Sequence, residues 1–232
     1  MDFFAGLCYI TGMETKKQES NREEWVSSVL EGLARQHPDA KPELDFTNAY
    51  ELLIATILSA QCTDKQVNKV TPRLFHDYPT PSDLAKADPA DIEPYIRSCG
   101  FYHNKSVNIV EACRDIVERF GGEVPGNREG LESLAGVGRK TASVVLSNAF
   151  GVPAIAVDTH VFRVSNRIGL ADAKNVENTE KQLMEAIPED KWSIAHHWLI
   201  FHGRRVCPAR NPKCGECFIK DLCKEYGERE KK

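Results

Sequence analysis

Four cysteines near the C-terminal end constrain the fold of this chain more than any other feature. Cys207, Cys214, Cys217 and Cys223 lie within 17 residues, separated by six, two and five residues. The chain has no apolar stretch long enough to span a membrane and no basic segment at its start. We therefore expect a cytoplasmic protein without a signal peptide, in which disulfides are rare. So compact a thiol cluster then predicts a metal centre. The spacing leaves zinc and an iron–sulfur cluster open.

The remainder of the sequence predicts an all-α protein. Apolar residues recur at helical spacing over residues 22–36, 49–60, 63–77 and 103–120. Pro38 and the Gly121–Gly122 pair predict helix ends. No segment alternates apolar and polar residues, so we expect no substantial strand. We expect residues 1–20 to form a loose tail.

Composition excludes several classes of protein. With 41% hydrophobic and 28% charged residues, the chain is neither collagen-like nor disordered. Its 232 residues suit one large domain or two small ones. A net charge of −4 argues against a wholly basic nucleic-acid binder. It leaves room for a local basic face, because composition averages such a face away.

Residues 131–146 predict two helices joined by a tight turn at Gly136, Val137 and Gly138, a helix–hairpin–helix. Backbone amides at the start of the second helix, followed by Arg139, form a site suited to one phosphate of a nucleic-acid backbone. Such a contact reads no base sequence. The alternative is an ordinary corner between two helices.

Lys140 and Asp158 are candidate catalytic residues. A lysine acts as a nucleophile when it is desolvated or assisted by a base. The second helix advances about 15 Å over residues 139–149. The following eight residues span up to about 26 Å, so the chain allows Asp158 to return beside Lys140 without requiring it. Lys140 could instead bind phosphate, and Asp158 could cap the next helix, a role compatible with catalysis.

Together these segments resemble the endonuclease III family of helix–hairpin–helix DNA glycosylases. The matching segments are Leu-Ser-Ala-Gln-Cys-Thr-Asp (58–64), Gly-Val-Gly-Arg-Lys-Thr-Ala (136–142), Val-Asp-Thr-His (157–160) and His-His-Trp-Leu-Ile-Phe-His-Gly-Arg (196–204), besides the cysteine spacing. The resemblance covers residues 22–226. It implies two helical domains with DNA in the cleft between them. One is a six-helix barrel over 42–152. The other joins 21–41 to 153–232 and holds a 4Fe-4S cluster on the four cysteines.

The resemblance also implies a monomeric base excision repair enzyme that acts on double-stranded DNA with a damaged base or an abasic site. The expected substrates are oxidised pyrimidines such as thymine glycol, flipped out of the stack before reaction. Lys140 would attack C1′ of the sugar with assistance from Asp158. The resulting Schiff base would lead to β-elimination, which is an AP-lyase activity.

Four further residues are expected to contact DNA. Gln61 aligns with the glutamine that fills the space left by the flipped base. Phe101 aligns with an apolar wedge, often leucine in the family; the alternative is a core aromatic. Arg210 and Lys213, between the first two cysteines, would meet phosphates, unless the segment is only a solvated charged loop.

Two other functions remain open at this point. The chain could be a monofunctional glycosylase for mismatched bases, in which a tyrosine commonly replaces the lysine, or a non-catalytic DNA-binding module. Lys140 argues against both. His196, His197 and His202 are interpreted as packing or hydrogen-bonding residues rather than metal ligands.

Overall fold

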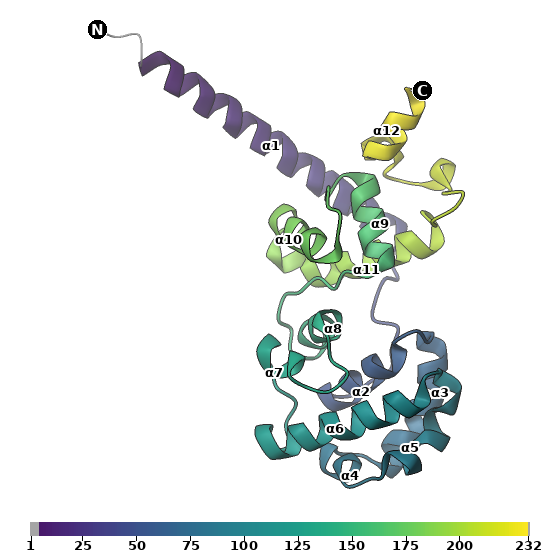
Figure 1. Ribbon diagram of the computed structural model, residues 1–232. Coiled ribbons are helices and arrows are strands. Elements are labelled where there is room, and N and C mark those ends of the chain that lie inside the picture. Colours follow the sequence, from purple (N-terminus) through teal and green to yellow (C-terminus); the bar gives the residue numbers. More distant parts are fainter. Residues whose placement is uncertain (1–4, 232) are drawn as a thin grey trace. The chain divides into compact units, whose positions relative to one another are not determined.

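The computed structural model describes the backbone of residues 5–231 and the side chains of residues 18–231, and every regular element in it is helical (Figure 1). The long helices are α1 (Ala5–Gln36), α2 (Ala49–Ser59), α3 (Asp64–Asp77), α6 (Tyr102–Phe120), α8 (Arg139–Ala149), α9 (Thr159–Ile168), α10 (Val176–Ala186) and α11 (Trp192–Arg205). The short ones are α4 (Pro81–Ala85), α5 (Pro89–Ile96), α7 (Arg128–Glu132) and α12 (Lys224–Glu230). Four 3₁₀ turns complete the list: η1 (Arg97–Cys99), η2 (Glu189–Lys191), η3 (Cys214–Glu216) and η4 (Lys220–Leu222).

The chain divides into two compact units. The hairpin unit consists of residues 41–156 and contains α2 to α8. The cysteine unit joins the residues up to 40 with those from 157 onward, so α1 belongs with α9 to α12. Among the described residues, no helix combines the length and the apolar character needed to cross a membrane.

Local sequence accounts for most helix boundaries. Asn48 and Thr63 accept hydrogen bonds from backbone amides in the first turns of α2 and α3, as N-cap residues do. At the other end of α6, Gly121 adopts a left-handed conformation with φ 65°, which a glycine takes without steric cost. The predicted helices over 49–60, 63–77 and 103–120 are thus confirmed within a residue or two.

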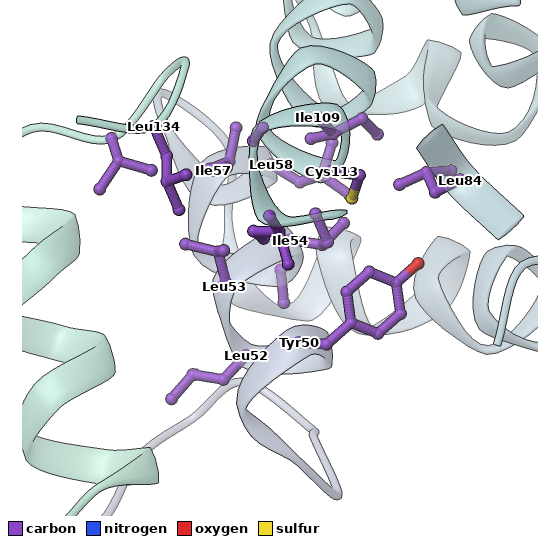
Figure 2. Close-up of a cluster of buried hydrophobic side chains, with 14 of the residues drawn as sticks. Tyr50, Leu52, Leu53, Ile54, Ile57, Leu58, Leu84, Ile109, Cys113 and Leu134 are labelled. Carbon is purple, nitrogen blue, oxygen red and sulfur yellow. The ribbon is translucent and has the colours of Figure 1, made fainter. Parts of the chain in front are cut away.

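The core of the hairpin unit lies between α2 and the helices around it (Figure 2). Leu53, Ile54 and Leu58 of α2 are fully buried, together with Ile109 of α6. Cys113 is also fully buried, and burial raises the pKa of its thiol to about 12. Cys113 therefore behaves as a small apolar residue.

The N-terminal segment differs from expectation. Helix α1 begins at Ala5, within the predicted loose tail of residues 1–20, and continues without interruption to Gln36. Residues 13–20 contain neither glycine nor proline and include Met, Glu, Lys and Gln, which favour helices. Nothing in that stretch stops the following helix from extending backward. Residues 1–4 lie outside the described part of the chain.

Candidate functional site

The turn between α7 and α8 contains two glycines with different constraints. Gly136 has φ +74°, and a Cβ at this position would lie 2.9 Å from Cβ of Asn108. Both the backbone and the neighbour therefore exclude a side chain. Gly138 has φ −102°, and a Cβ there would meet nothing within 4 Å. The described part of the fold thus needs glycine at 136 and tolerates a side chain at 138.

The amides near this turn are not equivalent. The side chain of Val137 is buried, and its N–H donates to the Leu134 carbonyl at 3.2 Å. Val137 thus anchors the turn in the core. Gly138 occupies the N-cap position of α8, where it has no side chain that could cap the first amides of the helix. Arg139 and Lys140 follow it and are exposed. The start of α8 is therefore the part of the turn suited to an anion.

Asp158 forms the N-cap of α9. Its backbone is extended, and Oδ1 accepts hydrogen bonds from the amides of His160 and Val161, both at 2.8 Å. The expected cap is thus present. Within the described residues, no hydrogen-bond donor is found on Oδ2, and the residue is half-buried. One oxygen of the carboxylate thus fixes the helix start, and the other takes no part in this capping. Lys140 belongs to the hairpin unit and Asp158 to the cysteine unit.

Gln61 and Phe101 share an unusual backbone conformation. Both have positive φ, 54° and 48°, although neither is a glycine. Left-handed residues of this kind are uncommon and cost about 1–3 kcal/mol each. Gln61 is exposed just after α2, and Phe101 is 64% exposed at the start of α6. The alternative of Phe101 as a core aromatic is therefore wrong.

The four cysteines near the C-terminus surround one space. Cys207, Cys214, Cys217 and Cys223 carry free thiols and are half-buried. All four line a single cavity, shared among others with Arg167, His202 and Tyr226. Within the described side chains, no three Cys, His, Asp or Glu converge on one point as ligands of a single ion would. Four thiols around a shared cavity form a donor set that fits an iron–sulfur cluster.

Two arginines of α9 bind the start of the cysteine segment, by which we mean the residues from 203 to 223 that contain the four cysteines. Arg167 donates to the carbonyls of Pro208 at 2.8 Å and Ala209 at 3.0 Å, and it lies 3.4 Å from Sγ of Cys207. Arg163 donates to the carbonyls of Gly203 at 3.0 Å and Cys207 at 3.2 Å. Sequence reasoning missed both residues. Their spacing of one helical turn was the available signal.

A buried histidine pair reaches one of the cysteines. Nε2 of His202 lies 3.7 Å from Sγ of Cys217, and Nδ1 lies 3.1 Å from Nε2 of His37. Both rings are almost fully buried, and burial lowers the pKa of His202 to about 4. His202 is thus a neutral hydrogen-bonding residue, consistent with its interpretation from the sequence.

The basic residues of the cysteine segment are not all available to a ligand. Arg210 and Lys213 are exposed. Arg205 instead forms two hydrogen bonds with Asp39, at 2.8 and 2.9 Å, and its guanidinium lies 4.2 Å from the centre of the Phe201 ring. The positive charge of Arg205 is therefore neutralised by Asp39 within the cysteine unit.

Comparison with known proteins identifies the class. Residues 54–189 match the HhH-GPD superfamily base excision DNA repair protein, and residues 207–223 match the iron–sulfur binding domain of endonuclease III. The first match covers the helix–hairpin–helix and Asp158, and the second begins and ends on the outer cysteines. The chain is therefore a base excision DNA repair protein of the helix–hairpin–helix class.

Individual relatives narrow the class to a family. The endonuclease III of Haemophilus influenzae is 50% identical over 201 residues, which cover 87% of this chain and 95% of that protein. A trapped endonuclease III–DNA covalent intermediate has a similar structure, with a TM-score of 0.83, 49% identity and coverage of 90% and 98%. A thermostable thymine-DNA glycosylase is more distant, with a TM-score of 0.78, 28% identity and coverage of 91% and 99%. The chain belongs to the endonuclease III family, and its cofactor is a 4Fe-4S cluster.

Proposed function

We propose that Lys140 and Asp158 are the catalytic pair with which this DNA glycosylase and AP lyase removes oxidised pyrimidines. Family membership over most of the chain carries the activity. The assignment of the pair is supported by Lys140 at the exposed start of α8 and by the second carboxylate oxygen of Asp158. A related enzyme trapped covalently on DNA is consistent with nucleophilic catalysis.

The chemistry proceeds in two stages. Asp158 takes a proton from the ammonium of Lys140, and the amine attacks C1′ as the bond between C1′ and the damaged base breaks. The departing base takes up this proton, and the carboxylate so restored stabilises the positive charge that develops on the sugar. Ring opening then gives a Schiff base between Lys140 and C1′. Loss of a proton from C2′ expels the 3′ phosphate by β-elimination, which cuts the strand 3′ to the lesion.

DNA is held by contacts that do not read sequence. The turn formed by Gly136 and Gly138 presents the first amides of α8, together with Arg139, to one phosphate. Gln61 and Phe101 enter the base stack at the lesion, which lowers the cost of holding the damaged base outside. The exposed side chains of Arg210 and Lys213 add phosphate contacts. The site thus recognises a distorted backbone and an extruded base.

The cluster has a structural role in this proposal. Cys207, Cys214, Cys217 and Cys223 are its ligands, and their thiols already line one cavity. When bound, the cluster supplies a rigid cross-link between its four ligands. It fixes the loop that bears Arg210 and Lys213, and the excision chemistry does not pass through it.

Borohydride trapping tests the lysine. Purified protein is mixed with a duplex that bears one thymine glycol, and borohydride reduces any Schiff base to a stable protein–DNA adduct. We expect an adduct with the natural chain and none with Lys140→Gln. An adduct that persists in Lys140→Gln contradicts the assignment. An adduct with an abasic site but not with thymine glycol retains the lyase and refutes the proposed base specificity.

Two substitutions separate the roles of Asp158. Asparagine caps helices as well as aspartate does, whereas alanine does not. Asp158→Asn should therefore keep the unfolding temperature and lose excision by a factor of about 10² or more. Asp158→Ala should lose both excision and about 1 kcal/mol of stability. Full activity in Asp158→Asn would show that the residue is only a cap.

A mismatch-specific monofunctional glycosylase is the competing function, because a thymine-DNA glycosylase shares the fold. Absence of any borohydride adduct, with base release intact, would favour it. DNA as the substrate supports a place in the cytoplasm at the nucleoid, and we propose that the protein acts there as a monomer. Fractionation of cells and sedimentation of the purified protein test these two points.

A further inference from the structure

Lys105 of α6 is a buried lysine that the proposed mechanism does not use. It is 4% exposed, and its Nζ donates hydrogen bonds to the carbonyls of Leu58 and Cys99, both at 2.8 Å. Burial also lowers the pKa of its ammonium. A buried ammonium is costly unless its protons find acceptors. An apolar side chain would avoid this cost, so the two charge-assisted bonds call for an explanation.

The two carbonyls lie at the base of the two strained turns. Leu58 precedes Gln61 by three residues, and Cys99 precedes Phe101 by two. Directly after each carbonyl, the chain leaves its helix and reaches an exposed residue with positive φ. One ammonium therefore fixes the backbone from which both of these side chains project.

Other contacts join the same two turns. Nε2 of Gln66 donates to Oγ of Ser98 at 2.7 Å, which links α3 to η1. The thiols of Cys62 and Cys99 also interact, and the pKa of Cys99 is raised to about 11 by burial and by this neighbour. Cys62 and Cys99 thus both belong to this junction, and Cys99 is buried in it. Lys105 is the charged part of that junction, and it is buried.

We propose that Lys105 is a positioning residue that sets the spacing of Gln61 and Phe101, so that both side chains can enter the DNA stack at a lesion. This inference rests on the proposed function of those two residues. Left-handed turns at non-glycine residues persist only where the surrounding structure holds them. Lys105 supplies that constraint to both turns at once, and it contacts neither DNA nor the reacting atoms in the proposal.

The proposal makes the effect of Lys105 depend on base pairing. A paired lesion must be unstacked and unpaired before reaction, and the two inserted side chains stabilise that state. A lesion without a partner base needs less help to leave the stack. Removal of the ammonium should therefore slow excision of a paired lesion much more than excision of an unpaired one. A general loss of stability would slow both to the same extent.

The test compares single-turnover excision of thymine glycol in two duplexes, one with adenine opposite the lesion and one with a tetrahydrofuran abasic analogue opposite it. Lys105→Met keeps the length of the side chain and removes the charge. We expect excision of the paired lesion to slow by a factor of about 10 to 100, as misplaced groups commonly cause, with little change for the unpaired lesion. Lys86→Met, an exposed lysine of the same unit, should leave both rates unchanged.

Equal slowing on both duplexes, or no slowing on either, would overturn the inference. Cluster absorbance and thermal unfolding check that Lys105→Met is folded. If it is not, Ser98→Ala replaces it, because this substitution removes only the exposed bond to Gln66. Ser98→Ala should also slow excision of the paired lesion selectively, by a smaller factor than Lys105→Met. If Ser98→Ala shows no selective slowing, the inference is likewise overturned. Failure of the unaltered protein to excise either lesion would instead refute the proposed function.

Discussion

At the scale of single residues, the turn between α7 and α8, which we propose binds a phosphate, contains one glycine that the fold requires and one that it does not. Gly136 is constrained by its positive φ and by the nearby Asn108. Gly138 is constrained by neither, since its backbone suits any residue and the space beside it is open. The approach of a DNA phosphate gives a reason for glycine at 138 that the described residues do not supply.

Alanine at each position should therefore have a different effect. Gly136→Ala should destabilise the protein by about 1–3 kcal/mol, because it combines left-handed strain with a steric clash. Gly138→Ala should leave stability unchanged or raise it by up to about 1 kcal/mol, while weakening binding to an abasic duplex. Thermal unfolding and fluorescence anisotropy measure the two effects. Unaltered DNA affinity in Gly138→Ala would remove phosphate approach as the reason for this glycine.

At the scale of elements, two helices hold the cysteine segment. Arg163 and Arg167 of α9 bind its start. On α1, Trp25 donates to the carbonyl of Leu222 at 3.1 Å, and Gly32 leaves room for Ile219, which a Cβ would strike. Asp158 is the N-cap of α9. The same helix therefore carries the proposed catalytic carboxylate at its start and the two arginines that bind the cysteine segment.

The loop between the first two cysteines should govern the salt dependence of DNA binding. Each phosphate contact contributes a slope of about −0.9 to a plot of log affinity against log salt. Arg210→Gln combined with Lys213→Gln should therefore reduce the slope by about 2. The double variant Lys174→Gln and Lys181→Gln removes two exposed charges from α10 and the residues before it. It should keep the natural slope. A natural slope in the first variant would leave Arg210 and Lys213 as solvated residues.

At the scale of the whole molecule, stability depends on histidines that are buried in the neutral form. His197 of α11 is 9% exposed, and burial lowers its pKa from about 6.5 to about 4. Between these values the unfolded chain binds a proton that the folded chain does not. Stability must therefore fall as the pH decreases from 6.5 toward 4 and rise in the opposite direction.

Replacing His197 should flatten this dependence. The natural protein should lose up to about 1.4 kcal/mol of unfolding free energy per pH unit from this residue in that range. In His197→Phe, the loss of unfolding free energy per pH unit should be smaller by up to about 1.4 kcal/mol. Urea unfolding of both proteins at pH 7.5 and pH 5 provides the comparison. The same pH-dependent loss in both proteins would show that His197 does not contribute.

The sequence by itself determined the local structure and most candidate groups. Helix starts at Asn48 and Thr63, the end at Gly121 and the turn at Gly136 each depend on residues within a few positions along the chain. The metal centre was equally local, because its four cysteines lie in one short segment. Local geometry depends on residues that are close along the chain, so it can be predicted from the sequence alone.

Only the tertiary structure decided which side chains are buried and which distant groups meet. Lys105 reaches a carbonyl 47 residues away, and Arg167 one that is 41 residues away. The exposure of Phe101 likewise decided between two interpretations that its residue type allowed, because a core aromatic would be buried. Burial and long-range hydrogen bonds depend on how whole helices pack. No stretch of sequence around these residues carries that information.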